Sequence, residues 1–250
     1  MVWGMTLPTS FGQFWPSGEF EYDAKTRDTD WYNRLSAYYE AQTPEEQKRL
    51  FDYRGEPASA SHFYSGFAVY KLTKEPGTKY NSGFEPPYGI VESHEVPRSF
   101  DTDKNYSSLG SLIKLNDRIL AVDEQLKAII ERLEPGLHQF FPIPITMPKG
   151  RVYPDSYYVL RVCQYIDAFA RYETWEGSFD ESTRTPSLLF LNTTKKAING
   201  LAMRQAAFGD AHLWRDRAFG EELACLSDEL MAEIETAGLR LPKHFKMKGV

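Results

Sequence analysis

Cysteine is scarce in this sequence, and long apolar runs are absent. The 250 residues include two cysteines, Cys163 and Cys225, and each lies in an apolar stretch. We therefore interpret both as small buried hydrophobic residues. No apolar run approaches the ~18 residues that a membrane-spanning helix needs. The first residues have neither the basic start nor the apolar stretch of a signal peptide. We therefore predict a cytoplasmic protein with no membrane partner.

Signatures of catalysis and of cofactor binding are also missing. The sequence has no GxGxxG or GxxxxGKS/T phosphate loop, no GxSxG serine elbow and no HExxH zinc motif. Two distant cysteines cannot supply the CxxC pair of a zinc deaminase. The histidines are His62, His94, His138, His212 and His244. No two of them share a metal-ligand spacing. We predict no cofactor and no metal site.

Aromatic residues, in contrast, are abundant, with 16 Phe, 15 Tyr and 5 Trp. Such residues fill cores, and Tyr and Trp also suit contact surfaces because they lose little rotamer freedom on binding. The formal net charge of −6 argues against a direct nucleic-acid partner, which needs lysine and arginine to neutralise phosphates. The same charge favours docking of a basic protein.

Helix signals are clearest where a capping residue precedes an apolar face. Asp123 and Ser227 each precede apolar residues spaced three and four apart, and Gly238 supplies a left-handed stop for the second helix. Thr43, followed by proline and two glutamates, marks a third start. These signals predict helices over 124–133, 228–237 and 44–54. Other patterns predict helices over 31–38, 108–117 and 194–208, and strands over 67–72, 88–91, 157–168, 187–191, 212–215 and 244–247.

Two extended segments carry more specific expectations. Residues 157–168 are apolar at both odd and even positions, which predicts a strand that is buried on both faces. Residues 137–145 contain two prolines, which exclude a helix and suit an edge strand. The mixture of helices and strands predicts an α+β fold with one mixed or antiparallel sheet and packed helices.

Two of these segments resemble each other. ILAVDEQLKAIIERL (119–133) aligns with LACLSDELMAEIETAGL (223–239), so that Asp123 matches the cap Ser227. Each helix is followed by an extended stretch that opens with histidine, His138 or His244. The pattern indicates two related helix–strand units, or the chance recurrence of a common motif. We expect a single domain over 1–250, in which the first hundred residues are either an integral part or a distinct subdomain.

An acidic and aromatic stretch is the richest candidate for a functional surface. Its candidate contact residues are Glu173, Trp175, Glu176, Phe179, Asp180 and Glu181. Four acids around two aromatic rings suit a contact patch for a basic protein. The alternative is a solvated loop whose aromatic side chains pack back onto the core.

The histidines offer a weaker, catalytic candidate. His94 lies in the sequence Glu-Ser-His-Glu, which resembles half of a general acid–base site. A hydrolase that uses His94 or His62 with nearby carboxylates is therefore one alternative, and a solvated loop histidine is the other.

The C-terminal part of the chain resembles immunity protein family 11 of bacterial polymorphic toxin systems. The resemblance covers about residues 108–250 and rests on VDEQLKAIIERL, EPGLHQFFPIPI, YYVLRVCQYIDAF and the ending HLWRD…CLSDELMAEIETAGL. The first hundred residues resemble the family weakly. One departure is the segment 192–211, which is longer and more helical than we expect between its flanking strands.

The resemblance implies a protein that is encoded beside a toxin used in interbacterial competition. Such a protein binds and neutralises the cognate toxin, often a nuclease, in the producing cell, and the family offers no catalytic residues to carry over. Stoichiometric toxin binding is therefore the leading function. The hydrolase and a non-catalytic scaffold protein of a secretion or envelope system are the alternatives.

Overall fold

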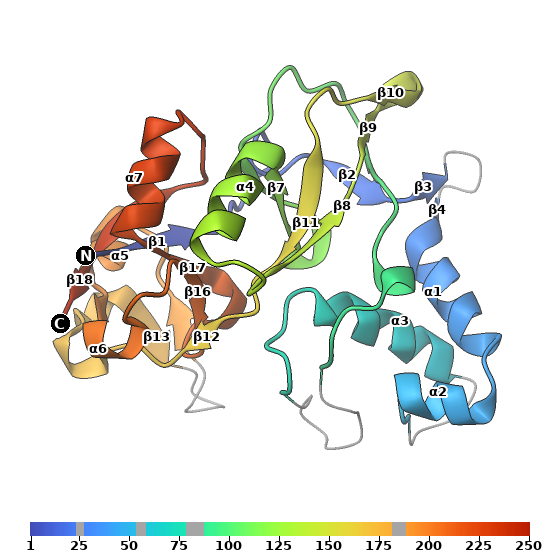
Figure 1. The fold of residues 1–250 in the computed structure, drawn as a ribbon, viewed down its shortest axis with the longest axis horizontal. Coiled ribbons are helices and arrows are strands. Elements are labelled where there is room, and N and C mark those ends of the chain that lie inside the picture. The colour runs from blue at the N-terminus through green and yellow to red at the C-terminus, as the bar shows by residue number, and fades with distance from the viewer. Residues whose placement is uncertain (24–27, 54–58, 79–87, 182–188) are drawn as a thin grey trace.

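The computed structural model of the chain describes residues 1–23, 28–53, 59–78, 88–181 and 189–250 (Figure 1). Helices and strands are interspersed, and most paired strands run antiparallel, so the fold is α+β as the sequence predicts. No helix within these ranges is long and apolar enough to cross a membrane.

The helices and strands have the following bounds. The helices are α1 (Asp30–Glu40), α2 (Pro44–Leu50), α3 (Ala60–Lys71), α4 (Glu124–Leu133), α5 (Lys195–Gly200), α6 (Gln205–Phe208) and α7 (Asp228–Thr236). The strands are β1 (Val2–Thr6), β2 (Gly18–Phe20), β3 (Tyr22–Asp23), β4 (Asp28–Thr29), β5 (Phe100–Thr102), β6 (Leu112–Lys114), β7 (Leu120–Asp123), β8 (Gln139–Pro142), β9 (Ile145–Met147), β10 (Arg151–Val152), β11 (Tyr157–Arg161), β12 (Tyr165–Ile166), β13 (Phe179–Glu181), β14 (Leu189–Leu191), β15 (Ala202–Met203), β16 (Leu213–Asp216), β17 (Leu223–Ser227) and β18 (His244–Gly249).

Three sheets of four or more strands organise the described part of the chain. The largest has the order β12-β16-β17-β1-β18-β15, and the other two have the orders β6-β7-β11-β8 and β10-β9-β5-β2. Strand β1 lies between β17 and β18, antiparallel to both, which brings the two chain ends together (Figure 1). The first strand of the chain therefore completes a sheet that is otherwise built from the last ninety residues.

The three capped helices form where the sequence predicts them. The side chains of Thr43, Asp123 and Ser227 each accept a hydrogen bond from the backbone N–H three residues later. Each cap satisfies one of the N–H groups that a helix start leaves without an intrahelical partner. Helix α2 ends at Leu50, earlier than predicted. Gly238, at φ 67°, follows α7 as the predicted left-handed stop.

The predicted strand over 67–72 is wrong, because residues 67–71 belong to helix α3 and Leu72 caps its end. Helix α3 is buried over most of its circumference, including Phe67, Ala68 and Val69, since it packs against α1 and against residues Tyr88 and Val91. A helix buried on most sides loses its polar stripe, so a short apolar run cannot be distinguished from a buried strand by periodicity. The predicted strand over 88–91 has no regular structure.

Two helix predictions also fail for reasons of packing. Residues 108–117 contain strand β6 instead, whose Leu112 and Ile113 are buried on opposite faces of the sheet. The helix over 194–208 is broken into α5, β15 and α6, because Leu201 has an extended backbone and the next two residues pair with β18. The predicted strand 157–168 is divided between β11 and β12, which lie in different sheets.

The other predicted elements are present. Helix α1 covers the predicted helix over 31–38, and β16 and β18 cover the predicted strands near 213 and 245. Strand β14 covers the predicted strand at 187–191, of which residues 187 and 188 lie outside the described ranges. Strand β8, which contains Pro142, lies at the edge of its sheet as its prolines require.

The two segments that resemble each other in sequence have the same topology. In β6-β7-β11-β8 and in β16-β17-β1-β18, a helix joins the second strand to the fourth, and the third strand is antiparallel to both. The caps correspond, because Asp123 pairs with Tyr157 on β11 and Ser227 pairs with Val2 on β1. The third strand differs in origin: β11 follows β8 in the chain, whereas β1 is the first strand.

Side-chain contacts repeat between these two units. The hydroxyl of Tyr158 on β11 donates to Glu124 at the start of α4, and Trp3 Nε1 on β1 donates to Asp228 at the start of α7 at 2.9 Å. The pairing corrects one detail of the sequence alignment. His244 lies opposite Met5, and the corresponding residue of the first unit is Phe140, opposite Leu160. His138 and His244 therefore do not occupy equivalent positions.

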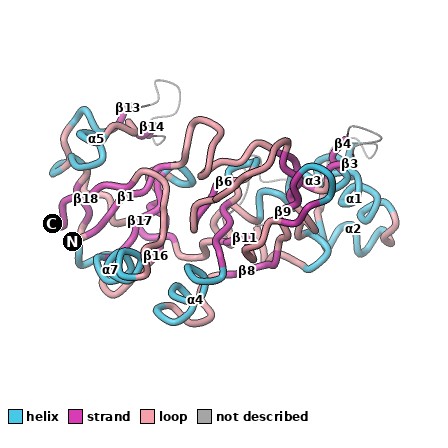
Figure 2. Tube along the Cα trace, turned by 90° about the horizontal axis from the view of Figure 1, so that it is seen from above, coloured by secondary structure: helices cyan, strands magenta, loops and turns pink. Residues whose placement is uncertain are grey.

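Three apolar clusters form the core. The first joins α1, α2 and α3 to one face of the β6-β7-β11 sheet, through residues such as Trp31, Tyr64 and Val159. The second lies between the other face of that sheet, helices α4 and α7, and the C-terminal sheet. The third lies on the opposite side of the C-terminal sheet. Helix α5 lies on that side of the sheet and α7 lies on the other (Figure 2). Because the first cluster spans residues from 20 to 159, the first hundred residues share their core with the middle of the chain.

Candidate protein-binding surface

The acidic and aromatic segment 171–181 follows β12 of the C-terminal sheet and ends in β13, which belongs to a separate two-stranded sheet. Two 3-10 turns, Arg171–Glu173 and Glu176–Ser178, precede β13, which pairs with β14. All four predicted contact acids are exposed: Glu173, Glu176, Asp180 and Glu181. Glu181 forms an ion pair with Arg171, and no ion pair of the other three is found among the described residues. The structure therefore presents the predicted acids to solvent on one continuous stretch.

The two predicted aromatic residues of this segment have different environments. Trp175 is 38% exposed, whereas Phe179 is half-buried and its ring meets the edge of Phe169 at 5.4 Å between centroids. Phe179 thus ties the segment to the third apolar cluster. Tyr172, which begins this stretch but is not among the predicted contact residues, is 96% exposed and is the most exposed large apolar side chain described.

Trp175 lies at one side of a hollow that sequence reasoning did not detect. The hollow has a volume of about 630 Å³ and is lined by Trp175, Lys195, Lys196, Asn199, Gly200 and Lys248. The backbone N–H of Trp175 donates to the Gly200 carbonyl at 3.0 Å, and Lys196 Nζ lies 4.3 Å from the centroid of the indole ring. A Cβ at Gly200 would lie 2.6 Å from Ser178 Oγ, so the close approach of α5 to this segment requires glycine.

His94 is held inside the packing of the N-terminal helices. Its ring stacks on Tyr38 at 3.7 Å between centroids, and Nε2 lies 2.7 Å from the hydroxyl of Tyr64. Glu92 lies 3.7 Å from Nδ1, so one carboxylate is near as the sequence suggests. Burial lowers the pKa of His94, which favours the neutral ring. The other neighbouring acid, Glu95, is fully buried and bound to Lys71 Nζ at 2.6 Å.

His62 is exposed and lies apart from His94. It lines a hollow of about 320 Å³ on the outer face of α3, together with aromatic side chains that include Phe63 and Tyr70. Among the described residues that line this hollow, none is the acid that the hydrolase alternative requires beside His62.

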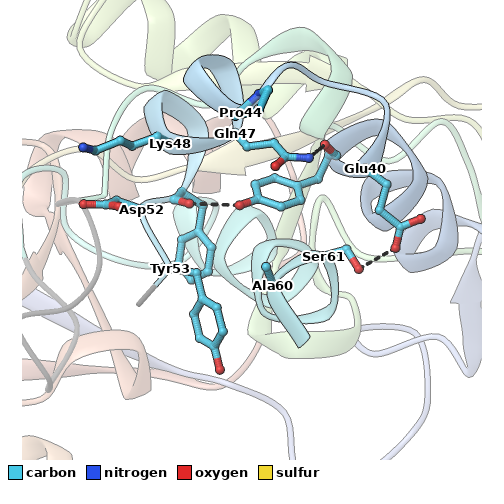
Figure 3. A pocket seen from close by; sticks show the side chains of 10 residues that line it. Glu40, Pro44, Gln47, Lys48, Asp52, Tyr53, Ala60 and Ser61 are labelled. Atoms are coloured by element: carbon cyan, nitrogen blue, oxygen red, sulfur yellow. Dashed lines mark hydrogen bonds between the residues drawn. The ribbon is translucent and has the colours of Figure 1, made fainter. Parts of the chain in front are cut away.

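A further hollow lies between α2 and α3 and contains two acids, Glu40 and Asp52 (Figure 3). Its polar groups serve the packing of the helices: Gln47 donates to the Tyr39 carbonyl at 3.0 Å, and Ser61 donates to Glu40 at 2.7 Å. Within the described ranges, no group of three or more His, Cys, Asp or Glu side chains could hold a metal ion.

A comparison with models of known protein families finds a match over most of the chain. Residues 42–249 match the model of the immunity protein family Imm11. The chain belongs to this family. The match begins well before residue 108, so it includes α2 and α3 as well as the C-terminal sheets, and the recognition made from the C-terminal sequence is confirmed. No curated protein matches the chain.

The Imm11 match also covers a buried polar cluster that sequence reasoning missed. Glu134, at the end of α4, accepts hydrogen bonds from His138 Nε2 at 2.7 Å and from the N–H groups of His212 and Leu213 at 2.7 and 3.1 Å. Burial alone raises the pKa of Glu134, but these hydrogen bonds outweigh it and the net pKa is lowered. Glu134 therefore links the first helix–strand unit to the start of β16 in the C-terminal sheet.

Together with Cys163, Glu134 and His138 resemble a Cys-His-Glu catalytic triad in arrangement. Their hydrogen bonds and the pKa of the thiol do not suit nucleophilic catalysis. His138 Nδ1 accepts a hydrogen bond from the backbone N–H of Cys163 at 3.2 Å, so this nitrogen is occupied. Burial raises the pKa of the Cys163 thiol, whereas a catalytic cysteine needs a lowered one. In this Imm11 protein the three residues hold β11, β8 and β16 together. The sequence predicts that both cysteines are buried, and Cys225 is fully buried whereas Cys163 is only partly buried.

Proposed function

We propose that the chain neutralises a cognate bacterial toxin by stoichiometric binding, in the cytoplasm of the cell that produces both. Membership of an immunity protein family over residues 42–249 is the observation that supports this function. We further propose that the segment 171–181 forms part of the toxin-binding surface. Its support is geometric, since four exposed acids and two exposed rings, Tyr172 and Trp175, stand on a backbone fixed by β13 and by Gly200.

The physical demands on such an inhibitor explain why both charge and aromatic area are useful. Lasting protection needs nanomolar affinity or better, about −12 kcal/mol. An interface of roughly 800 Å² on each partner can supply this free energy only through a few buried anchors. The acids would speed the capture of a basic toxin, such as a nuclease, and Trp175 would slow its release.

The test uses the toxin domain encoded by the gene next to that of this protein. Co-expression is expected to protect cells, and the purified pair to elute as a 1:1 complex. Trp175→Ala should mainly raise the dissociation rate. Replacing Glu173, Glu176, Asp180 and Glu181 by their amides should mainly lower the association rate, most clearly at low salt.

Matched controls distinguish an effect of the 171–181 surface from the general effect of removing an exposed ring or four negative charges. Phe11→Ala removes an exposed ring elsewhere, and the amides of Glu45, Asp210, Glu229 and Glu235 change the net charge equally. Both controls should bind like the parent. If the 171–181 variants also bind like the parent, the contact surface lies elsewhere, and if no complex forms, the toxin-binding function itself is wrong.

The hydrolase alternative has one specific observation in its favour, the proximity of Glu92 to His94. A binding mechanism needs neither histidine. His62→Ala and His94→Gln should therefore each protect toxin-producing cells as well as the parent does. Loss of protection by either variant, with its fold and complex formation intact, would favour catalysis.

A further inference from the structure

The hollow beside Trp175 concentrates positive charge on a chain whose formal net charge is −6. Lys195 and Lys196 begin α5, and Lys248 comes from β18, which packs beside that helix. All three side chains are exposed, and among the described residues none of the three forms an ion pair. Three neighbouring cations that form no ion pair create a local positive potential that attracts an anionic group.

The Trp175 ring already contacts one of these lysines and Gly177, which limits the area on which a base could stack. Lys196 Nζ lies over the ring at 4.3 Å from its centroid, which is a cation–π contact. Gly177 contacts the same ring so closely that a Cβ there would lie 2.5 Å from it. Proteins that bind single-stranded nucleic acids need free aromatic faces on which bases stack. The hollow therefore fits a small anionic side chain better than a nucleotide.

We propose that this lysine-lined hollow receives a carboxylate-bearing segment of the toxin, one or more Asp or Glu side chains. The proposal rests on the proposed toxin-binding function and adds the chemistry of the partner at this position. A volume of about 630 Å³ accommodates a short segment of side chains rather than a lone ion. Asn199 lines the same hollow and offers an amide that can donate to a carboxylate.

The hollow and the acids of the segment 171–181 then form a surface of two opposite charges around Trp175. Exposed ion pairs contribute little affinity one by one, so their main effect is on orientation and on the choice of partner. A toxin that presents basic and acidic groups in the matching order docks in one register, and a toxin with the reverse order is repelled. The segment 192–211 supplies two of the three lysines.

The first experiment measures binding of the purified toxin domain to the full chain. The variant carries Lys195→Glu, Lys196→Glu and Lys248→Glu, and the control carries Lys48→Glu, Lys104→Glu and Lys149→Glu, which change the net charge equally at exposed positions elsewhere. We expect at least a tenfold loss of affinity for the first and less than a threefold change for the second. The corresponding Lys→Gln variant should lose an intermediate amount, which shows the effect without charge reversal.

The second experiment does not depend on the toxin. A capped tetraglutamate peptide is titrated into the isotope-labelled full chain, and the indole N–H signal of Trp175, assigned with Trp175→Phe, is followed by NMR. We expect this signal and the amides of residues 195–200 to shift in the parent and not in the Lys→Glu variant. Oligodeoxythymidylate is the comparison anion.

The outcomes distinguish a failure of carboxylate binding in the hollow from a failure of toxin binding by the whole chain. If the parent and the Lys→Glu variant bind the toxin equally, the inference about the hollow fails while toxin binding stands. If the peptide shifts no signal, or the oligonucleotide shifts the same signals more strongly, a carboxylate partner is also ruled out. If the toxin does not bind the parent, the proposed function fails, and the peptide titration still decides whether the hollow binds carboxylates.

Discussion

At the scale of single residues, the N-terminal helices are tied together by one cluster of buried polar groups. Glu95, fully buried, accepts from Lys71 at 2.6 Å and from the hydroxyl of Tyr64 at 3.2 Å. The Glu95 side chain also accepts from the N–H of Glu92, which closes a capping box. His94 completes the cluster through its contact with Tyr64. An isolated buried charge is costly, so the cluster is stable only because each member has a partner.

The lowered pKa of His94 predicts how stability responds to pH. Near neutral pH the ring is uncharged in both the folded and the unfolded chain. As the pH falls below the ordinary value of 6.5, the unfolded chain binds a proton that burial disfavours in the folded chain, so stability decreases. Glu92 and Glu95 partly oppose this effect, whereas Lys71 and Arg34 add to it.

Replacing His94 by glutamine should weaken this dependence. Urea unfolding midpoints of the parent and of His94→Gln are compared at about pH 7.5 and about pH 5.5, a range that stays above the ordinary pKa values of carboxylates. The parent should lose more stability over this range than the variant. An equal loss in both proteins would show that another group is responsible.

At the scale of elements, helices α4 and α7 bury the faces that their periodicity predicts. Leu126 and Ile130 on α4 are 1% and 2% exposed, and Leu230 and Ile234 on α7 are 0% and 1% exposed. All four belong to the same apolar cluster, and Arg132 of α4 forms an ion pair with Glu233 of α7. The two helix–strand units therefore share one core, which neither could bury alone.

Truncation of any of these four residues to alanine should lower the free energy of unfolding by about 2–5 kcal/mol. Chemical denaturation measures the change, and the exposed Gln125→Ala and Glu229→Ala serve as controls, with changes expected within about 0.5 kcal/mol. Because Leu126 and Leu230 lie in one cluster, their double variant should deviate from additivity. Changes below about 1 kcal/mol for two of the four would show that this core is not essential.

The elements that the sequence predicts wrongly share a physical cause. Residues 67–72 and 108–117 are short apolar stretches whose periodicity is erased by burial on several sides, so their state is decided by the surrounding elements. Helices with a polar face and a side-chain cap, such as α4 and α7, are predicted to within a residue or two, because the signal is local.

At the scale of the whole molecule, the distribution of the core predicts one cooperative unit over residues 1–250. The first cluster joins the N-terminal helices to β7 and β11, and Arg217 forms an ion pair with Glu75 at 2.6 Å across the molecule. Strand β1 holds a place inside the C-terminal sheet. The first hundred residues therefore share their core and one end of their chain with the later elements.

Hydrogen exchange with mass spectrometry in increasing urea tests this prediction. Peptides from α1 and α3 should lose protection at the same urea concentration as peptides from α7 and β17. Earlier loss in α1 and α3 would instead identify a separate N-terminal subdomain. As an independent check, deletion of residues 1–6 should destabilise the C-terminal sheet, because β17 and β18 would lose their common neighbour.

The sequence by itself determined the features that depend on neighbours along the chain. The caps at Asp123 and Ser227, the apolar faces behind them, the edge strand with its prolines and the membership of an immunity protein family were all readable as local patterns. Only the tertiary structure decided which distant residues meet. It placed β1 between β17 and β18, and it brought Trp175 to Lys195, Lys196 and Lys248. The physical reason is that caps and periodicity act over a few residues, whereas strand pairing and surface charge depend on contacts that only the packed core creates.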